Sequence, residues 1–191
     1  PPPTIDVPIE AIMEKEPITV LSSEKGWIKA TKGHFTDPSQ AKYKDGDSGK
    51  FLIQAETTDK VILFATNGRF YTISCNKLPG GRAFGEPLRL LVDLENDHDI
   101  VNLFLYRPGE KFVIASNSGR GFIVKSDEIF AQTKNGKQVL NIKHNEEAVA
   151  CCKVEGDHVA VIGENRKLLL FSLKEIPEMG RGRGVILQRY N

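Results

Sequence analysis

The sequence has few of the features that mark a disulfide-rich or membrane-spanning protein. Its 191 residues include three cysteines, Cys75, Cys151 and Cys152. An odd number with two adjacent members argues for reduced thiols and a cytoplasmic chain. No apolar run approaches the roughly 20 residues that a membrane helix needs. Residues 1–16 have neither the basic end nor the apolar core of a targeting signal, and we interpret them as a linker.

Motifs for enzymatic and metal chemistry are also missing. The serine, histidine and aspartate residues show no nucleophile elbow or triad spacing, and residues 80–86 lack the Lys-Ser/Thr of a phosphate-binding P-loop. The acidic segment 93–99 lacks the central glycine and terminal glutamate of a calcium loop. No histidine has a partner at metal-ligand spacing; the four are His34, His98, His144 and His158. The sequence therefore predicts no catalytic residue, cofactor or metal in this chain.

What the sequence does contain is a repeated strand–turn–strand pattern. Four segments have an apolar strand, a polar turn and a second strand, starting at Ile18, Val61, Phe112 and Val159. The second strands start 42, 51 and 46 residues apart, at Trp27, Arg69, Arg120 and Arg166. A period in the forties with paired strands is typical of a propeller-like array. Asn67-Gly68 predicts a type I′ hairpin turn.

Further strand-like runs complete each repeat. Segments 49–57, 99–107 and 147–155 each precede the next hairpin. Shorter runs follow the basic loops, at residues 87–91, 138–142 and 184–188. Each repeat then has about four strands, which is one blade. We therefore expect an all-β fold with four blades that stack, because one repeat cannot bury its own apolar face.

Basic, glycine-rich loops follow the second strand of each hairpin. The net charge of +1 does not reveal these loops, because acidic residues elsewhere in the chain balance their charge. They are KGHF (32–35), PGGRAFG (79–85), KNGKQ (134–138) and GRGRG (180–184). Glycine permits close approach to a phosphate, and Lys or Arg supplies the charge. Four such loops in equivalent places on one rim predict binding to a nucleic-acid backbone. The hairpin arginines are interpreted more simply as solvated residues beside turns. Trp27 is interpreted as a core anchor, with a stacking platform as the alternative.

Five stretches carry a resemblance to a known family: EKEPITVLSSEKGWIKATKGH, YKDGDS, LPGGRAFGEPL, SNSGRGF and MGRGRGVILQRY. Over residues 10–191 the chain resembles the C-terminal domain of the A-subunit of bacterial DNA topoisomerase IV, whose repeats are shared with the gyrase A-subunit. The resemblance implies a β-pinwheel over residues 17–191, in which blades exchange strands, with a DNA-binding rim. It also implies a non-catalytic part of a type II topoisomerase. The catalytic tyrosine belongs to a core outside this domain, so that role falls to none of Tyr43, Tyr71, Tyr106 and Tyr190.

The same resemblance implies the partners and the setting. They are double-stranded DNA, the breakage-reunion core of the same polypeptide, and the topoisomerase IV B-subunit in a bacterial cytoplasmic heterotetramer, with no membrane. The domain would bias strand passage toward particular DNA topologies. The glutamine-led Gly/Arg heptapeptide of gyrase is absent, which favours guiding DNA over tight wrapping. A gyrase-type wrapping domain and a propeller that only binds proteins remain the alternatives.

The expected DNA contacts are basic residues in or near the four loops: Lys29, Lys32, His34, Arg82, Lys134, Lys137, Arg181, Arg183 and Arg189. The hairpin arginines Arg69, Arg120 and Arg166 are secondary candidates. The last segment, 184–191, begins like a blade strand. We expect it either to pair with the first repeat and close the ring, or to lead into a further blade.

Overall fold

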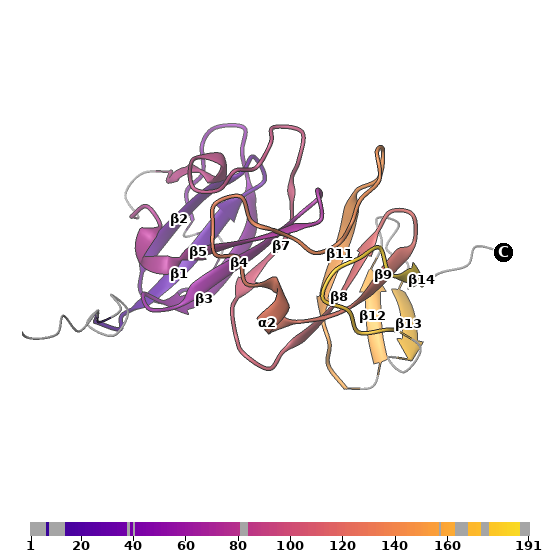
Figure 1. The fold of residues 1–191 in the computed structure, drawn as a ribbon. Coiled ribbons are helices and arrows are strands. Elements are labelled where there is room, and N and C mark those ends of the chain that lie inside the picture. Colours follow the sequence, from indigo (N-terminus) through magenta and orange to yellow (C-terminus); the bar gives the residue numbers. More distant parts are fainter. Residues whose placement is uncertain are drawn as a thin grey trace, which may run out of the picture. The chain divides into compact units, whose positions relative to one another are not determined.

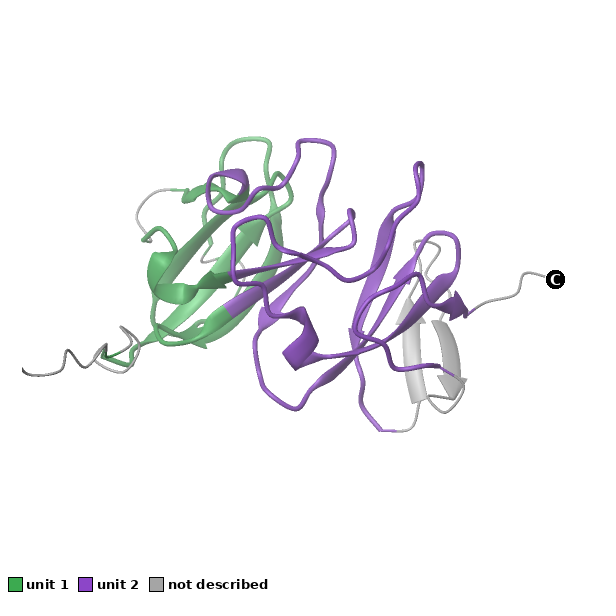
Figure 2. Ribbon diagram, in the orientation of Figure 1, with its two compact units in different colours: residues 1–60, 73–88 green, residues 61–72, 89–191 purple. Residues whose placement is uncertain are grey.

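The structure is a computed structural model that describes residues 7, 14–37, 39, 41–80, 84–156, 158–162, 168–172 and 176–187, with only the backbone of 158–162 and 168–172. Its elements are nearly all β-strands (Figure 1). The chain divides into two compact units (Figure 2). The first comprises residues 1–60 and 73–88, and the second comprises residues 61–72 and 89–191.

The first unit is built on one antiparallel sheet of four strands in the order β3-β1-β2-β6. Its strands are β1 (Pro17–Ser23), β2 (Trp27–Lys32), β3 (Gly49–Glu56) and β6 (Glu86–Pro87). After Pro17, every residue of β1 is buried. A strand buried on both faces carries apolar residues on both, as Ile18, Val20 and Leu21 do here, while the buried Thr19 hydroxyl donates to the Gly33 carbonyl over 2.7 Å. By contrast β3, at the edge of the sheet, is only half-buried.

Two further antiparallel sheets lie mostly in the second unit, with the ends of β4 and β5 in the first. One has the order β10-β5-β4-β7, with β4 (Lys60–Ala65), β5 (Arg69–Ser74), β7 (Ile100–Leu105) and β10 (Lys137–Gln138). The other has the order β11-β8-β9-β14, with β8 (Lys111–Ser116), β9 (Arg120–Lys125), β11 (Ala148–Lys153) and β14 (Val185–Ile186). The first strand of each hairpin is again almost wholly buried. These sheets therefore repeat the plan of the first unit.

In each four-stranded sheet, one of the two outer strands comes from the chain segment that follows the next hairpin in sequence. β6 follows the hairpin β4-β5 in sequence but pairs with β2. In the same way β10 follows β8-β9 and pairs with β5, and β14 follows a later hairpin and pairs with β9. This topology is that of a β-pinwheel, so the predicted strand exchange is confirmed. The expectation that segment 184–191 pairs with the first repeat is wrong for its described part, because Val185 pairs with Gly121.

The Asn67-Gly68 turn differs from the predicted type I′ geometry. Gly68 N–H donates to the Ala65 carbonyl over 2.9 Å, and Gly68 has φ of 79°. Asn67 is not among the described residues with positive φ, as a type I′ turn would require. The loop is instead a type I turn closed by a left-handed glycine. Gly26 and Gly119 close the hairpins β1-β2 and β8-β9 in the same way, with N–H to carbonyl distances of 3.1 and 3.0 Å.

A shared core joins the two sheets of the second unit. It contains Phe64 and Phe70, whose rings stack at 4.4 Å, together with aliphatic side chains from β8 and β9. Phe104 of β7 stacks on Phe112 of β8 at 4.5 Å. Such aromatic pairs add about 0.5–1.5 kcal/mol beyond area burial. The predicted stacking of blades is therefore present between these two sheets.

The remaining described elements are short. They are the helix α2 (Ser126–Ile129) and the 3-10 turns η2 (Cys75–Lys77) and η3 (Leu88–Leu90). Segment 87–91, expected as a strand, is mostly η3 after the short β6. The fourth predicted hairpin is present as β12 (His158–Ile162) and β13 (Leu168–Ser172), which pair with each other. No helix in the described part of the chain is long and apolar enough to cross a membrane.

Candidate nucleic-acid interface

Three of the four basic loops lead directly into an exchanged strand. We call residues 79–85, 134–136 and 180–184 the exchange loops, because they precede β6, β10 and β14. Each ends in a glycine with positive φ: Gly85, Gly136 and Gly184, at 89°, 72° and 75°. In the second and third repeats this glycine lies 16 residues after the hairpin arginine. The loop Lys32–Phe35 instead follows β2 at once, so it is not equivalent to the others, contrary to expectation.

The final glycine of each exchange loop is required by the strand exchange itself. A Cβ at Gly184 would lie 2.0 Å from the Gly121 carbonyl oxygen. At Gly85 and Gly136 it would lie 2.1 and 2.6 Å from the carbonyls of the equivalent residues of β2 and β5. Glycine alone fits such close backbone approach at positive φ. These glycines therefore have a structural reason that does not depend on a phosphate.

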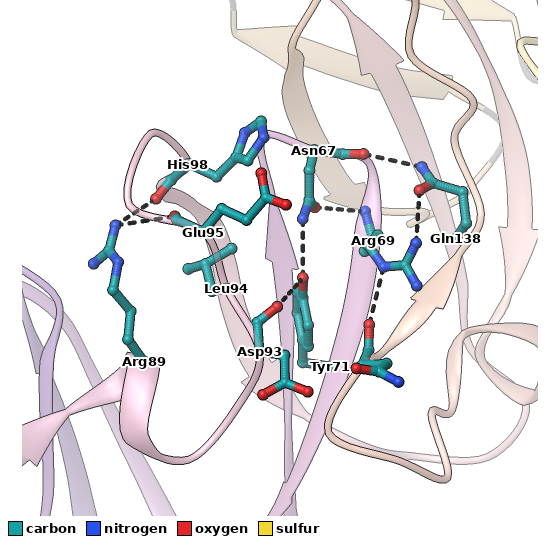
Figure 3. A pocket seen from close by; sticks show the side chains of 10 residues that line it. Asn67, Arg69, Tyr71, Arg89, Asp93, Leu94, Glu95, His98 and Gln138 are labelled. Carbon is teal, nitrogen blue, oxygen red and sulfur yellow. Dashed lines mark hydrogen bonds between the residues drawn. The ribbon is translucent and has the colours of Figure 1, made fainter.

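The hairpin arginines hold the exchange loops in place. Arg69 Nε donates to the Asn135 carbonyl over 2.9 Å, and its Nη1 donates to Gln138 Oε1 over 3.1 Å (Figure 3). Arg120 Nη1 donates to the Gly184 carbonyl over 3.3 Å. Both arginines thus act on the backbone of the loop that follows the next hairpin. Guanidinium N–H groups that the sequence predicts to face water therefore donate to acceptors of the protein.

The cations of the exchange loops fall into exposed and paired groups. Lys134 and Arg181 are exposed, and within the described residues Arg181 makes a long contact, 3.4 Å from Nε to Asn141 Oδ1. Arg183 Nη2 instead lies 2.9 Å from Glu146 Oε1, and both side chains are mostly buried. Lys137 Nζ lies 3.5 Å from Glu128 Oε2. The structure thus separates two residues to which the GRGRG motif gave the same role.

In the first unit the candidates Lys29, Lys32 and His34 have different environments. Lys32 is exposed at the end of β2. His34 is exposed too, with Nε2 2.7 Å from the Ala55 carbonyl oxygen. Lys29 is only 5% exposed, and its Nζ donates to the Lys42 carbonyl over 3.0 Å. Burial, with the nearby charge of Lys42, lowers the pKa of Lys29. A buried ammonium with a backbone partner does not suit a direct phosphate contact.

Trp27 occupies the position of a hairpin arginine without being a core residue. It is half-buried, and Lys44 Nζ lies 3.6 Å from the centroid of its ring. This is a cation–π contact, strongest with tryptophan. The expectation that Trp27 anchors the core is therefore wrong. Three further predicted residues, Arg82, Arg166 and Arg189, lie outside the described residues.

A polar cavity of about 650 Å³ lies beside the Arg69 hairpin (Figure 3). Arg89 Nη2 reaches into the acidic loop 93–99 and donates to the carbonyls of Glu95, Asn96 and His98, at 3.4, 3.1 and 2.9 Å. The carboxylates of Asp93 and Glu95 line the cavity, and Asp97 lies next to Glu95 and His98 in the same loop. Acidic groups face a phosphate unfavourably, so this cavity is not part of the candidate interface.

The chain is similar in sequence to a known protein family and to several of its relatives. Residues 59–106, 110–151 and 157–191 match the sequence pattern of the family described as DNA gyrase C-terminal domain, beta-propeller. The chain is 49% identical to the A-subunit of DNA topoisomerase 4 from Caulobacter vibrioides over 185 residues, 97% of the chain and 24% of that protein. With the same protein of Rickettsia conorii the identity is 47%, over 96% of the chain and 25% of that protein. The chain thus spans about a quarter of these relatives.

Solved structures show the same fold. The E. coli ParC C-terminal domain superposes with a TM-score of 0.76 at 26% identity, covering 88% of this chain and 70% of that one. The DNA gyrase A C-terminal domain superposes with a TM-score of 0.60 at 17% identity, covering 90% and 60% of the two chains. At 17% identity, the likeness to the gyrase domain concerns the fold alone. The overall fold of the chain is therefore shared with these solved structures.

Proposed function

Because the chain belongs to the DNA gyrase C-terminal β-propeller family, as a domain of the topoisomerase IV A-subunit type, we propose that it binds duplex DNA without being catalytic itself. The duplex would be engaged by the exposed cations of the exchange loops and presented to the strand-passage core of a type II topoisomerase. Such presentation biases strand passage toward particular DNA topologies. The setting is the bacterial cytoplasm, with the core of the same polypeptide and the B-subunit of the enzyme as partners.

One observation carries this proposal. In the second unit, two successive exchange loops are fixed in the same way, by a final glycine and a hairpin arginine, and each offers an exposed cation, Lys134 or Arg181. A side chain held on a rigid loop loses less freedom on binding than one on a mobile loop. Repeated cations on a repeated scaffold suit the repeated charge of a phosphate backbone.

The exposed cations suit backbone contact more than base readout. Lysine is a point charge that binds phosphate without directional pairing. Contacts to phosphate position a duplex but carry no sequence information. The domain is therefore expected to bind duplexes of unrelated sequence with similar affinity.

The test is a titration of the 191-residue chain with a short duplex at several salt concentrations. Neutralising Z phosphates gives a slope of log K against log salt of about −0.9Z. Three or more contacts predict a slope of about −3 or steeper, and similar affinity for duplexes of different sequence. A propeller that only binds proteins predicts no duplex binding at low salt. That result would overturn the proposal.

A further inference from the structure

The first repeat has its own counterpart of the exchange loops. In the second and third repeats, the final glycine of the loop lies 16 residues after the hairpin arginine. The same count from Trp27 reaches Tyr43, which is flanked by Lys42 and Lys44. The segment Lys32–Phe35, chosen from its composition, lies well before this point. By its spacing, the repeat therefore places Lys42 and Lys44 at the position of an exchange loop, although this segment is not glycine-rich.

This segment is attached to β2 by two side chains of that strand. Trp27 and Lys29, two residues apart, lie on the same face of β2. The Trp27 ring holds the Lys44 ammonium at 3.6 Å, and Lys29 Nζ donates to the Lys42 carbonyl over 3.0 Å. The loop thus contacts β2 at two points, through the side chain of Lys44 and the backbone carbonyl of Lys42.

The end of the loop is fixed in the way that the other repeats fix theirs. Glu24 N–H, in the hairpin turn, donates to the Ser48 carbonyl over 2.8 Å, just before β3. Thr66 and Asn117 make the equivalent bonds to the residues that precede β7 and β11, at 2.9 and 2.8 Å. The first repeat therefore keeps the loop framework even though its sequence in this segment lacks the glycine-rich motif.

Lys42 and Lys44 make no ion pair in the described part of the chain, although Asp45 and Asp47 follow them in the sequence. Lys42 and Lys44 are exposed, and neither lies within 4.0 Å of a carboxylate oxygen in the described part of the chain. Residues 25–50 contain six lysines and three aspartates. One of these carboxylates, Asp47, already accepts hydrogen bonds from the backbone N–H groups of Lys25 and Ser48. The lowered pKa of the buried Lys29 also reflects repulsion by Lys42.

This differs from the paired cations of the second unit. Lys137 stands 17 residues after its hairpin arginine, as Lys44 stands 17 after Trp27. Yet Lys137 lies 3.5 Å from a Glu128 carboxylate oxygen. A lysine paired with a carboxylate must give up that partner to bind phosphate, whereas Lys44 has no such partner to lose in the part of the chain that the structure describes. Lys44 is therefore the stronger phosphate ligand of the two.

We propose that Lys42 and Lys44, held by Trp27 and Lys29, form a phosphate-binding site for duplex DNA in the first unit. The inference rests on the proposed DNA-binding function and adds a contact site to it. Lys42 and Lys44 are the residues that touch phosphate. Lys29, first expected to do so, acts through the Lys42 carbonyl and is a positioning residue.

The test compares two double variants in the duplex titration. Lys42→Ala with Lys44→Ala removes the two ligands, and the slope of log K against log salt should become shallower by about two units. The matched control is Lys15→Ala with Lys153→Ala, which loses the same charge. Its lysines are exposed but paired with Glu56 and Glu110, at 3.1 and 3.2 Å. The control should keep the wild-type slope within about half a unit.

A second measurement does not depend on affinity. Acylation of lysine amines, read by mass spectrometry, should slow at Lys42 and Lys44 when saturating duplex is present, and should not change at Lys15 and Lys153. If the wild-type chain binds with a steep slope but both double variants behave alike and protection is absent, this inference is overturned while the proposed function stands. If the wild-type chain does not bind duplex at all, the proposed function itself fails.

Discussion

The strand exchange predicts a large difference between two glycine substitutions. Gly136 closes an exchange loop at φ of 72°, and a Cβ there would lie 2.6 Å from the Phe70 carbonyl oxygen and 2.8 Å from the Tyr71 ring. Gly109, between β7 and β8, has almost the same φ, 77°, but its Cβ would meet nothing within 4 Å. Substitution by alanine therefore costs the same backbone strain at both sites and a steric conflict at one only.

The magnitudes follow from the contacts. Left-handed backbone costs a non-glycine residue roughly 1–2 kcal/mol, partly offset by about 0.4–1 kcal/mol from the more restricted unfolded chain. Gly109→Ala should therefore cost about 1 kcal/mol. In Gly136→Ala, β10 must also move away from β5, which weakens that ladder and the two hydrogen bonds of Arg69. At roughly 0.5–1.5 kcal/mol for each of the two Arg69 hydrogen bonds, this adds about 1–3 kcal/mol, to which the weakened ladder contributes further.

Urea unfolding followed by circular dichroism measures the difference. The midpoint for Gly136→Ala should fall well below that for Gly109→Ala, and Gly109→Ala should stay close to the wild type. Equal losses in the two variants would refute the reasoning, because the glycine would then serve backbone conformation alone and not the close approach to β5.

Three other predictions concern single side chains and DNA topology. Arg183→Ala should cost about 1–2 kcal/mol in thermal unfolding because it leaves the mostly buried Glu146 without its partner, whereas Arg181→Ala should stay within about 0.5 kcal/mol; equal costs would contradict the separation of the two arginines. Hydrogen bonds from Lys111 and then Lys125, at 2.8 and 3.1 Å, lower the pKa of Glu178, so its stabilising effect is full above the ordinary glutamate pKa of about 4.3 and is lost as the pH falls through the lowered folded value. The melting temperatures of wild type and Glu178→Gln should accordingly differ at neutral pH and converge in acid, and a constant difference would contradict this. Finally, relaxation of a circular plasmid in the presence of the chain should leave its linking number unchanged, because the glutamine-led heptapeptide is absent; a stoichiometric shift would instead indicate wrapping of the gyrase type.

Local patterns predicted the hairpins well. The second strands begin at Trp27, Arg69 and Arg120, as the repeat indicated, because strand propensity and turn residues act over short distances. The exchange of outer strands was implied only by the family resemblance. A short apolar run has the same pattern whether it pairs with its own sheet or with the preceding one, so periodicity alone cannot reveal the exchange. The turn type was missed because Asn-Gly also fits a loop in which only the glycine has positive φ.

The candidate site was predicted less completely than the fold. Composition drew attention to loops with glycine beside Lys or Arg, and it grouped Arg181 with Arg183, whose surroundings differ. The burial of Lys29, which argues against a direct contact with DNA, is not indicated by any local pattern, because Lys29 occupies a position in β2 that an exposed residue could also take. Composition did not indicate Lys42 and Lys44, which we propose as contacts, whereas the 16-residue spacing from Trp27 leads to the residue between them.

The central claim is that exposed cations on the exchange loops contact phosphate. Its most direct test is the salt dependence of duplex binding by the variant Lys134→Ala with Arg181→Ala, compared with Lys111→Ala with Lys125→Ala, whose lysines are paired with Glu178. The account predicts that the slope of log K against log salt becomes shallower by about two units in the first variant and changes little in the second. An unchanged slope in the first variant, or an equal change in both, would contradict the account.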